Sequence, residues 1–204
     1  MDNILINKSG TYQFDLSNNN ILIKIESNLN VVINSYYSGI DNCSLSVDVS
    51  DNSKVHYYSY NFASLNRNLE VNIGENSFLE TYFLELGGNN SSSSLINING
   101  YNSELAYNLV AYEDKNISSN HTIKVNHLNK KTTSNINNYA VLDDFAHFFI
   151  DVTSFIKKGC SGSNTYQHSK AVSLSPTATS NIDPILLIDE FDVQGGHRCN
   201  VWNN

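Results

Sequence analysis

The chain has 204 residues with a formal net charge of −8, and 40% of its residues are hydrophobic. It is long enough to fold as one domain around a buried core and too apolar to be a disordered chain. Its Lys and Arg residues are few and scattered, and no apolar run approaches the roughly 18 residues that span a bilayer, so we expect neither nucleic-acid nor membrane partners.

The residue counts favour strands and turns over helices. Asn occurs 33 times and Pro only 2 times, and Asn is unfavourable inside helices but common in turns and left-handed backbone positions. The three cysteines, Cys43, Cys160 and Cys199, are far apart and form no CxxC pair. This spacing excludes a disulfide framework and, with no secretory signal at the N-terminus, predicts a cytoplasmic location.

A repeat with a period of about 24 residues runs along the first half of the chain. Three segments share the order apolar, any, apolar, two turn residues, Asn, two residues, apolar: IKIESNLNV at 23–31, VDVSDNSKV at 47–55 and VNIGENSFL at 71–79. In a looser fourth copy the anchor Asn102 follows Asn76 by 26 residues, and Ile96 and Ile98 are shifted by one position. This shift indicates a bulge or an insertion.

Apolar residues alternate within each copy, which is typical of half-buried strands. A strand–turn–strand unit of this size cannot close its own core, whereas stacking one copy on the next buries the apolar stripe. We therefore predict one all-β domain over residues 1–204, a parallel β-helix of about 24 residues per repeat, with Asn28, Asn52 and Asn76 stacked at its corners. The alternative is an antiparallel β-sandwich, whose strands do not usually keep a fixed residue at a fixed period.

Several side chains in the middle of the chain are candidates for chemistry. His121 and His127 would lie on one strand face about 20 Å apart, too far to share a metal, and we interpret both, with His168, as polar surface residues. Cys160 lies in KKGCSGS, a predicted flexible loop where neighbouring lysines would lower the pKa of its thiol. The acidic pair Asp143–Asp144 could act as general acid or base only in a cleft.

After this region, the segment VLDDFAHFFIDVTSFI at 141–156 favours strand, because it is rich in Val, Ile, Phe and Thr. The acidic pair Asp189–Glu190 follows a predicted buried strand at 185–188. Like Asp143–Asp144, it could act as general acid or base only in a cleft. Phosphate-binding loops, nucleophile elbows and dinucleotide fingerprints are absent from the sequence, so we do not expect an enzyme.

The closing stretch FDVQGGHRCNVW places His197 and Cys199 two residues apart, on the same face of a strand. The preceding Gly195 and Gly196 predict a turn or bulge at this point. Imidazole and thiolate are good ligands for iron or zinc, but two ligands do not complete a site. A ligand pair shared across a dimer interface is therefore the more plausible arrangement.

From His127 to Cys199 the chain resembles the core domain of the SufB and SufD proteins, scaffolds of the SUF iron–sulfur cluster assembly system. The resemblance is carried, in order, by HLNKKTTS, VLDDFAHFFIDV, QHSKAVSLS and DPILLIDEFDVQGGH. In the last of these, Pro184, Ile188, Asp192, Val193 and His197 are in register with the family pattern. The repeats upstream of His127 resemble the family only in their general repeat pattern and not in specific motifs.

The resemblance implies a right-handed parallel β-helix and a SufD-like scaffold that is not an enzyme. It implies that the chain pairs through the β-helix, as a homodimer or with a SufB-like partner. It also implies a SufC-type ATPase as a further partner. His197 matches the histidine at the family's dimer interface, where a transient iron–sulfur cluster is thought to form. His197 is thus the expected metal and cofactor ligand, and Cys199 an additional cofactor ligand.

The chain also departs from the family pattern. Gly195 stands where the family has a cysteine, Arg198 replaces a glycine, and Cys199 is out of register. The helical segments that flank the family's core have no counterpart in the sequence, which puts docking of a SufC-type ATPase in doubt. The alternatives are a β-helical interaction module that has lost cluster chemistry, and a carbohydrate-active or adhesin domain built on the 12 tyrosines.

Overall fold

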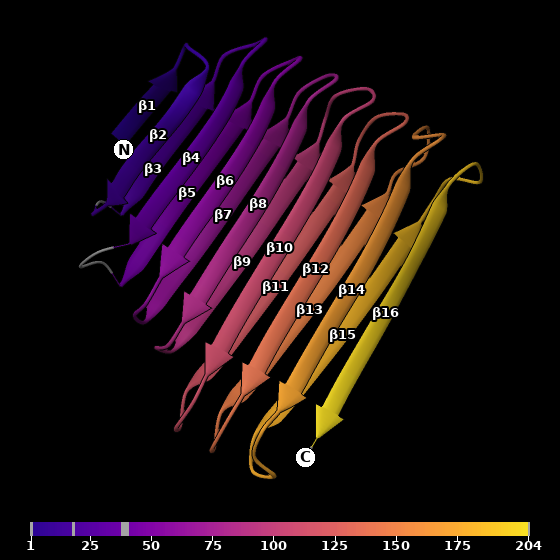
Figure 1. The fold of residues 1–204 in the computed structure, drawn as a ribbon. Helices are drawn as coiled ribbons and strands as arrows, with labels where there is room; N and C mark the ends of the chain where they lie inside the picture. Colours follow the sequence, from indigo (N-terminus) through magenta and orange to yellow (C-terminus); the bar gives the residue numbers. More distant parts are fainter. Residues whose placement is uncertain (1, 18, 38–40, 204) are drawn as a thin grey trace.

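The computed structural model describes residues 2–17, 19–37 and 41–203, and this part of the chain contains sixteen strands and no helix. The strands form two eight-stranded sheets (Figure 1). Sheet A contains, in spatial order, β1 (Asp2–Ile6), β3 (Asn20–Ile25), β5 (Asn42–Val49), β7 (Leu65–Ile73), β9 (Asn90–Ile98), β11 (Ser118–His127), β13 (His147–Ile156) and β15 (Thr179–Ile188). Sheet B contains β2 (Gly10–Leu16), β4 (Asn30–Tyr37), β6 (Lys54–Asn61), β8 (Phe78–Leu86), β10 (Glu104–Glu113), β12 (Thr133–Leu142), β14 (Asn164–Ser173) and β16 (Gln194–Asn203).

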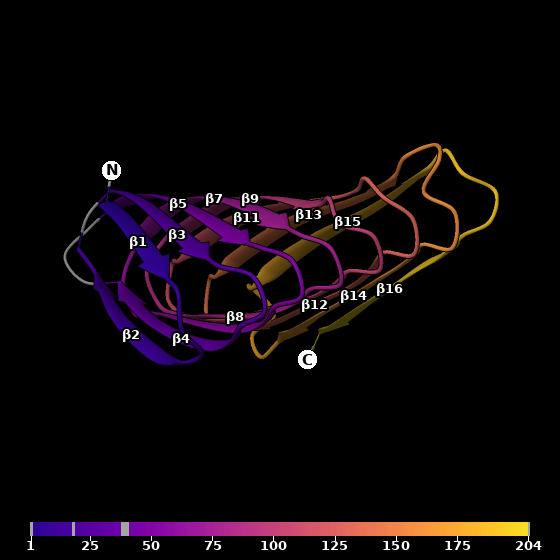
Figure 2. The same ribbon diagram turned by 90° about the horizontal axis from the view of Figure 1, so that it is seen from above.

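Successive strands alternate between the two sheets, so the chain winds as a flattened coil with one sheet on each side (Figure 2). Every neighbouring pair within a sheet is parallel, for example β5 with β7 and β10 with β12. The predicted β-solenoid is therefore confirmed, and the antiparallel sandwich is wrong. No helix in the described residues has the length and apolar composition needed to cross a membrane.

The turns that lead from sheet A into sheet B, here called the first corner, are built around left-handed residues. The anchors of the repeat all have positive φ: Asn28 (66°), Asn52 (57°), Asn76 (50°) and Asn102 (56°). Each anchor donates its backbone N–H to a carbonyl in the next coil, as Asn52 does to Glu75 at 2.8 Å. Between the last two anchors the side chains also bond, since the Asn102 amide donates to the Asn76 Oδ1 at 3.1 Å.

A buried row of hydroxyl side chains follows these anchors and satisfies the polar backbone of the corner. Its members are Ser53, Ser77, Ser103, Thr132 and Ser163. The Ser53 N–H donates to the Ser77 Oγ at 3.1 Å, and the Ser53 hydroxyl donates to the Glu26 carbonyl at 3.0 Å. A buried backbone group without a partner would cost about 1–3 kcal/mol, so this row makes the tight corner compatible with burial.

Replacing Asn76 by Ala is expected to lower the free energy of unfolding by about 1–2 kcal/mol, because Ala is unfavourable at positive φ. Asn76→Gly should restore most of this loss, since Gly adopts the conformation freely. Urea unfolding followed by circular dichroism measures both, with Asn66→Ala on an exposed position of β7 as the control. Equal effects of Ala and Gly at position 76 would show that the left-handed backbone is not the cause.

The coil lengthens along the chain. Asn30 pairs with Lys54, 24 residues later, whereas Thr133 pairs with Asn164, 31 residues later. The shift predicted in the fourth copy is one extra residue after Ile98, since Ile96 and Ile98 remain paired with Val71 and Ile73. The N–H groups of Asn99 and Gly100 both donate to the Ile73 carbonyl at 3.0 Å, which is the pattern of a bulge.

The insertion is accommodated at the first corner, where Gly100 approaches the preceding coil. A Cβ atom at this position would lie 2.1 Å from the Glu75 backbone nitrogen. Only glycine therefore fits at this corner.

The interior differs between the two ends of each strand. Next to the first corner it is apolar, with Ile25, Val49, Ile73 and Ile98 stacked in register and fully buried. Each such side chain contributes about 1.5–3 kcal/mol by leaving water. Towards the second corner, the set of turns that lead from sheet B back to sheet A, the interior contains polar and charged side chains, and these include Arg67 and Glu85.

Candidate functional site

His197 and Cys199 lie on β16, the last strand of sheet B, which pairs with β14 alone. His197 is opposite Gln167 and Cys199 is opposite Ser169. Side chains in register on parallel strands point the same way, and both partners on β14 are buried. His197 and Cys199 therefore face the inside of the coil, as the prediction of a shared face requires, but both are exposed because no further coil covers them.

The predicted turn at Gly195 and Gly196 is wrong. The two glycines continue β16 and pair with Thr165 and Tyr166, because the chain has already turned at residues 189–193. A Cβ atom on Gly195 would lie 3.1 Å from the Ile188 Cδ1, so a small residue is favoured where the last coil closes.

The surroundings of His197 and Cys199 offer polar contacts but no complete metal site. Burial, and then the charge of Asp183, raise the pKa of the Cys199 thiol, so the thiol is not activated. Beneath them the Gln167 amide donates to the Ser154 Oγ at 2.9 Å and to the Ile185 carbonyl at 3.1 Å. Across residues 2–17, 19–37 and 41–203, no three His, Cys, Asp or Glu side chains are placed to hold a metal ion together.

The other two cysteines are enclosed. Cys160 was expected in a flexible loop with a lowered pKa, but it is buried, and its thiol donates to the His127 carbonyl at 3.2 Å. Burial, and then the charge of Glu190, raise its pKa. Cys43 is buried beside Arg67, and burial likewise raises its pKa. Neither thiol is poised as a nucleophile.

The interpretation of His121 and His127 as solvated residues is wrong, because both side chains are fully buried. His127 occupies the inward row of Ile98 and bonds the Thr132 Oγ1 at 2.8 Å and the Ser134 Oγ at 2.9 Å. Burial lowers the pKa of His127 to about 4. Alternation predicted correctly that both lie on one face, but the face that they share is the interior.

His168 is half-buried on the outer face of β14, in edge-to-face contact with Tyr139. The acidic pairs Asp143–Asp144 and Asp189–Glu190 lie in exposed or half-exposed turns of opposite corners. The Asp143 carboxylate accepts from the Asp144 N–H at 2.8 Å, and the Glu190 carboxylate from the Gly159 N–H at 2.8 Å. The two acidic pairs therefore lie at different corners of the coil. The hydrogen bonds of Asp143 and Glu190 give these two carboxylates a structural role in their turns.

An ionic network inside the coil was not predicted from the sequence. The Arg67 Nη2 donates to the Glu85 Oε1 at 2.8 Å, and the two residues are only 2% and 3% exposed. The guanidinium also lies over the Phe83 ring, 4.1 Å from its centroid. Burial opposes the charge of Arg67, but the Glu85 carboxylate and the tyrosine side chains around the guanidinium together outweigh burial and raise the pKa of Arg67.

His121 and Glu113 extend this network along the interior. The His121 Nδ1 bonds the Ser92 Oγ at 2.7 Å, and its Nε2 lies 4.0 Å from the Glu85 Oε2. Burial lowers the pKa of His121. Burial also raises the pKa of Glu113, and with the charge of Glu85 the value reaches about 7. The network thus pairs the Arg67 guanidinium with the Glu85 carboxylate.

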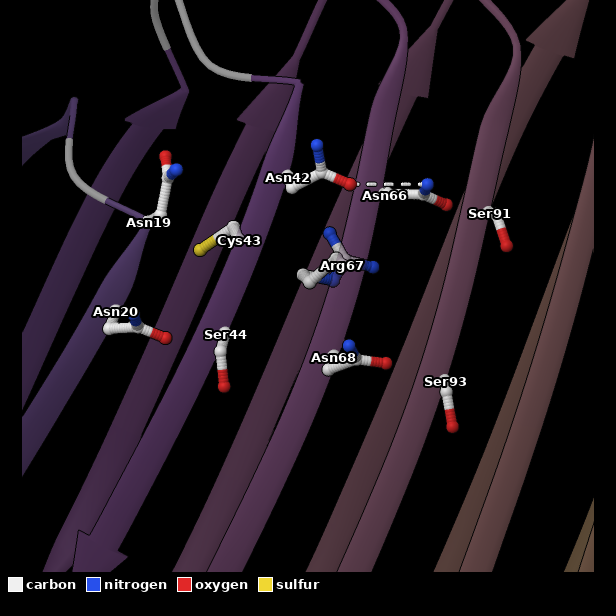
Figure 3. A pocket seen from close by; sticks show the side chains of 10 residues that line it. All are labelled: Asn19, Asn20, Asn42, Cys43, Ser44, Asn66, Arg67, Asn68, Ser91 and Ser93. Atoms are coloured by element: carbon white, nitrogen blue, oxygen red, sulfur yellow. Dashed lines mark hydrogen bonds between the residues drawn. The ribbon is translucent and has the colours of Figure 1, made fainter.

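A shallow groove on the outer face of sheet A is lined almost entirely by amides and hydroxyls (Figure 3). Asn20, Ser44, Asn68 and Ser93 form one row across four strands, and Asn42, Asn66 and Ser91 form a second. Cys43 and Arg67 also border it, but both are buried. The groove offers hydrogen bonds, and the exposed side chains in these rows carry no acid or base.

Four tyrosines on the outer face of sheet B stack on one another in pairs. On the outer face of sheet B, Tyr36 stacks on Tyr60 with centroids 4.9 Å apart, and Tyr58 stacks on Tyr82 at 5.4 Å. The ring faces therefore cover one another instead of being open to a sugar. This arrangement weakens the carbohydrate alternative.

The family of the chain is shown by comparison with known proteins. The family described as "SUF system FeS cluster assembly, SufBD core domain" matches residues 5–203. The iron–sulfur cluster assembly protein SufD of Bacillus subtilis (strain 168) is 34% identical over 84 residues, which cover 41% of this chain and 19% of that protein. The chain therefore belongs to the SufBD core domain family of the SUF iron–sulfur cluster assembly system.

Proposed function

We propose that the chain is a SufD-like scaffold of iron–sulfur cluster assembly with no catalytic turnover of its own. His197 would be a ligand or transfer residue for a transient cluster at a dimer interface, and Cys199 would supply a thiolate beside it. The placement of these two side chains carries the proposal, because they lie together on the inward side of the last strand, at the uncovered end of the coil.

The same end of the coil supports a dimer interface. Within residues 2–17, 19–37 and 41–203, β15 and β16 each end a sheet, so one edge of each has no strand partner from this part of the chain. Such edges are templates for pairing with another chain. Exposed apolar side chains border them, among them Leu187, Ile188 and Phe191. The proposed partner is a second copy or a SufB-like protein, together with a SufC-type ATPase in the cytoplasm.

Two observations favour a second candidate function, an interaction module without a cluster. The position of the family's cysteine holds Gly195, and the raised pKa of the Cys199 thiol disfavours the thiolate that binds metal. In this case the coil end would still form the dimer, and neither His197 nor Cys199 would bind iron.

Anaerobic iron–sulfur reconstitution separates the two candidates. Wild type, His197→Ala and Cys199→Ser are each treated alone and with a SufC–SufB pair, and absorbance and iron content are measured. A loss of most of the cluster in His197→Ala is expected, because the interface would lose a ligand. His168→Ala on the outer face of β14 is the matched control.

The outcomes are distinct. Cluster formation that is unaffected by His197→Ala and Cys199→Ser would contradict the proposed ligands. A stable dimer with no cluster in any combination would establish the second candidate.

A further inference from the structure

Part of sheet B has its larger apolar side chains on the outside. In β10 and β12 the second inward positions from the second corner are Ala111 and Ala140, both buried, while Leu142 is the last inward residue of β12. The outward neighbours are Tyr112, Tyr139 and Val141, which are exposed. A sheet with one solvated face normally places large apolar residues inward and polar residues outward. Here the pattern is reversed.

These outward side chains belong to two rows that continue from coil to coil. The first row is Tyr36, Tyr60, Leu84, Val110 and Tyr139. The second row is Leu86, Tyr112, Val141, Val172 and Trp202. The first row continues beyond β12 as Lys170 and Asn200, which are polar. We call the two apolar rows together the apolar strip. Its first row runs from β4 to β12 and its second from β8 to β16, strands that follow one another in sheet B (Figure 1).

The apolar strip is not a general property of the surface. On sheet A the corresponding outer rows contain Asn and Ser from β3 to β9. The strip is also extended at the second corner by Phe62 and Phe145, which are 61% and 60% exposed. A contiguous apolar patch of this extent on a soluble protein marks an interaction surface.

The dimensions of the strip fit one helix. The six steps from β4 to β16 at about 4.8 Å each give a length of about 29 Å, and the two rows are about 7 Å apart. A 20-residue helix is 30 Å long and about 10 Å wide. A second sheet would need a wider apolar face. The neighbouring outward row contains Tyr58 and Tyr82 on β6 and β8, but Asn34 on β4 and Asn108 and Asn137 on β10 and β12.

The rim of the strip at the second corner is acidic. Asp114, Asp143 and Asp144 lie in the turns after β10 and β12, with Lys115 as the opposing charge. A second copy docking through this strip with its strands parallel to those of the first would bring like-charged rims together. A helix with basic residues along one flank would instead complement the rim.

We propose that the apolar strip is the docking site of an amphipathic helix of about 20 residues whose flank towards the second corner is basic. The apolar stripe of the helix would cover Val110, Tyr112, Tyr139 and Val141, and its basic flank would lie beside Asp143. The strip lies on the outer face of sheet B, whereas His197 faces the inside of the coil, so the proposal does not depend on cluster binding.

Trp202 provides the measurement, because it is the single tryptophan and lies at the C-terminal end of the strip, 62% exposed. The probe is a synthetic 21-residue helical peptide with one Leu stripe, Lys along one flank and Gln elsewhere. Binding should shift the Trp202 emission to the blue. A peptide of the same composition in scrambled order, which has no continuous apolar stripe, is the peptide control.

Three variants of the full chain test the surface. Tyr139→Thr/Val141→Thr should weaken peptide binding by about tenfold or more, and Asp143→Asn should weaken it less and reduce its salt dependence. Leu95→Thr, an equally exposed apolar position on sheet A, should bind like wild type. Thr is chosen because it retains β propensity.

Four results would overturn the proposal. The first is equal binding of the scrambled peptide, and the second is unchanged binding by the double variant. The third is a wild-type dimer, seen by light scattering, that the double variant converts to a monomer, since a second copy would then occupy the strip. No emission shift at peptide concentrations up to the millimolar range would also count against it.

Discussion

Arg67→Met is expected to lower the free energy of unfolding by about 3–5 kcal/mol. The substitution removes the cation but leaves the Glu85 carboxylate buried, 3% exposed, with its partner gone. His121 cannot replace the guanidinium, because burial lowers its pKa. Urea unfolding followed by far-ultraviolet circular dichroism gives the measurement.

The double variant Arg67→Met/Glu85→Met isolates the cause. It removes both charges and retains side chains of similar length, so most of the loss should be recovered. Lys124→Met on the outer face of β11 is the control and should change stability by less than about 0.5 kcal/mol. A double variant as unstable as Arg67→Met would mean that the packing of Arg67 on Phe83, and not the unpaired charge, determines the effect.

The architecture was predictable because its cause is local and repeated. The asparagine anchors occupy left-handed corner positions, and a left-handed residue at a fixed period fixes where each strand ends. The later corners were harder to recognise, because Lys131 and Gly162 take over the same position and the period grows. The backbone requirement persists there, but the residue that satisfies it changes.

The interior network could not be assigned from residue type alone, because a charged residue in a strand is more often exposed. The alternation nevertheless contained the signal. Leu65, Leu69 and Val71 are inward in β7, and Arg67 has the same parity. The same reasoning applied to β11 would have placed His127 inside, since it shares the parity of Ile123 and Val125.

For the candidate site, strand parity correctly placed His197 and Cys199 on one face. The prediction that Gly195 and Gly196 turn the chain was wrong. The corner at 189–193 had already done so, and Gly195 is small because it packs against Ile188. The exposure of the last coil depends on the whole stack of strands, so no local sequence pattern could predict it.

Glu113→Gln is expected to change the pH dependence of stability by about 3 kcal/mol between pH 4.5 and 7. The pKa of Glu113 is raised from 4.5 to about 7 by burial and the charge of Glu85. The folded chain thus holds a proton in this range that the unfolded chain has lost. The corresponding stability is complete below pH 4.5 and is lost as the pH rises to 7, whereas Gln stays neutral throughout.

His127 acts with the opposite sign. Burial lowers its pKa from 6.5 to about 4, so its contribution is complete above pH 6.5 and is lost as the pH falls to 4. In wild type the two slopes largely cancel between pH 4.5 and 6.5. Relative to wild type, Glu113→Gln should therefore gain stability as the pH rises, and His127→Asn should gain it as the pH falls. Parallel curves for wild type and Glu113→Gln would show that Glu113 is ionised inside the folded coil.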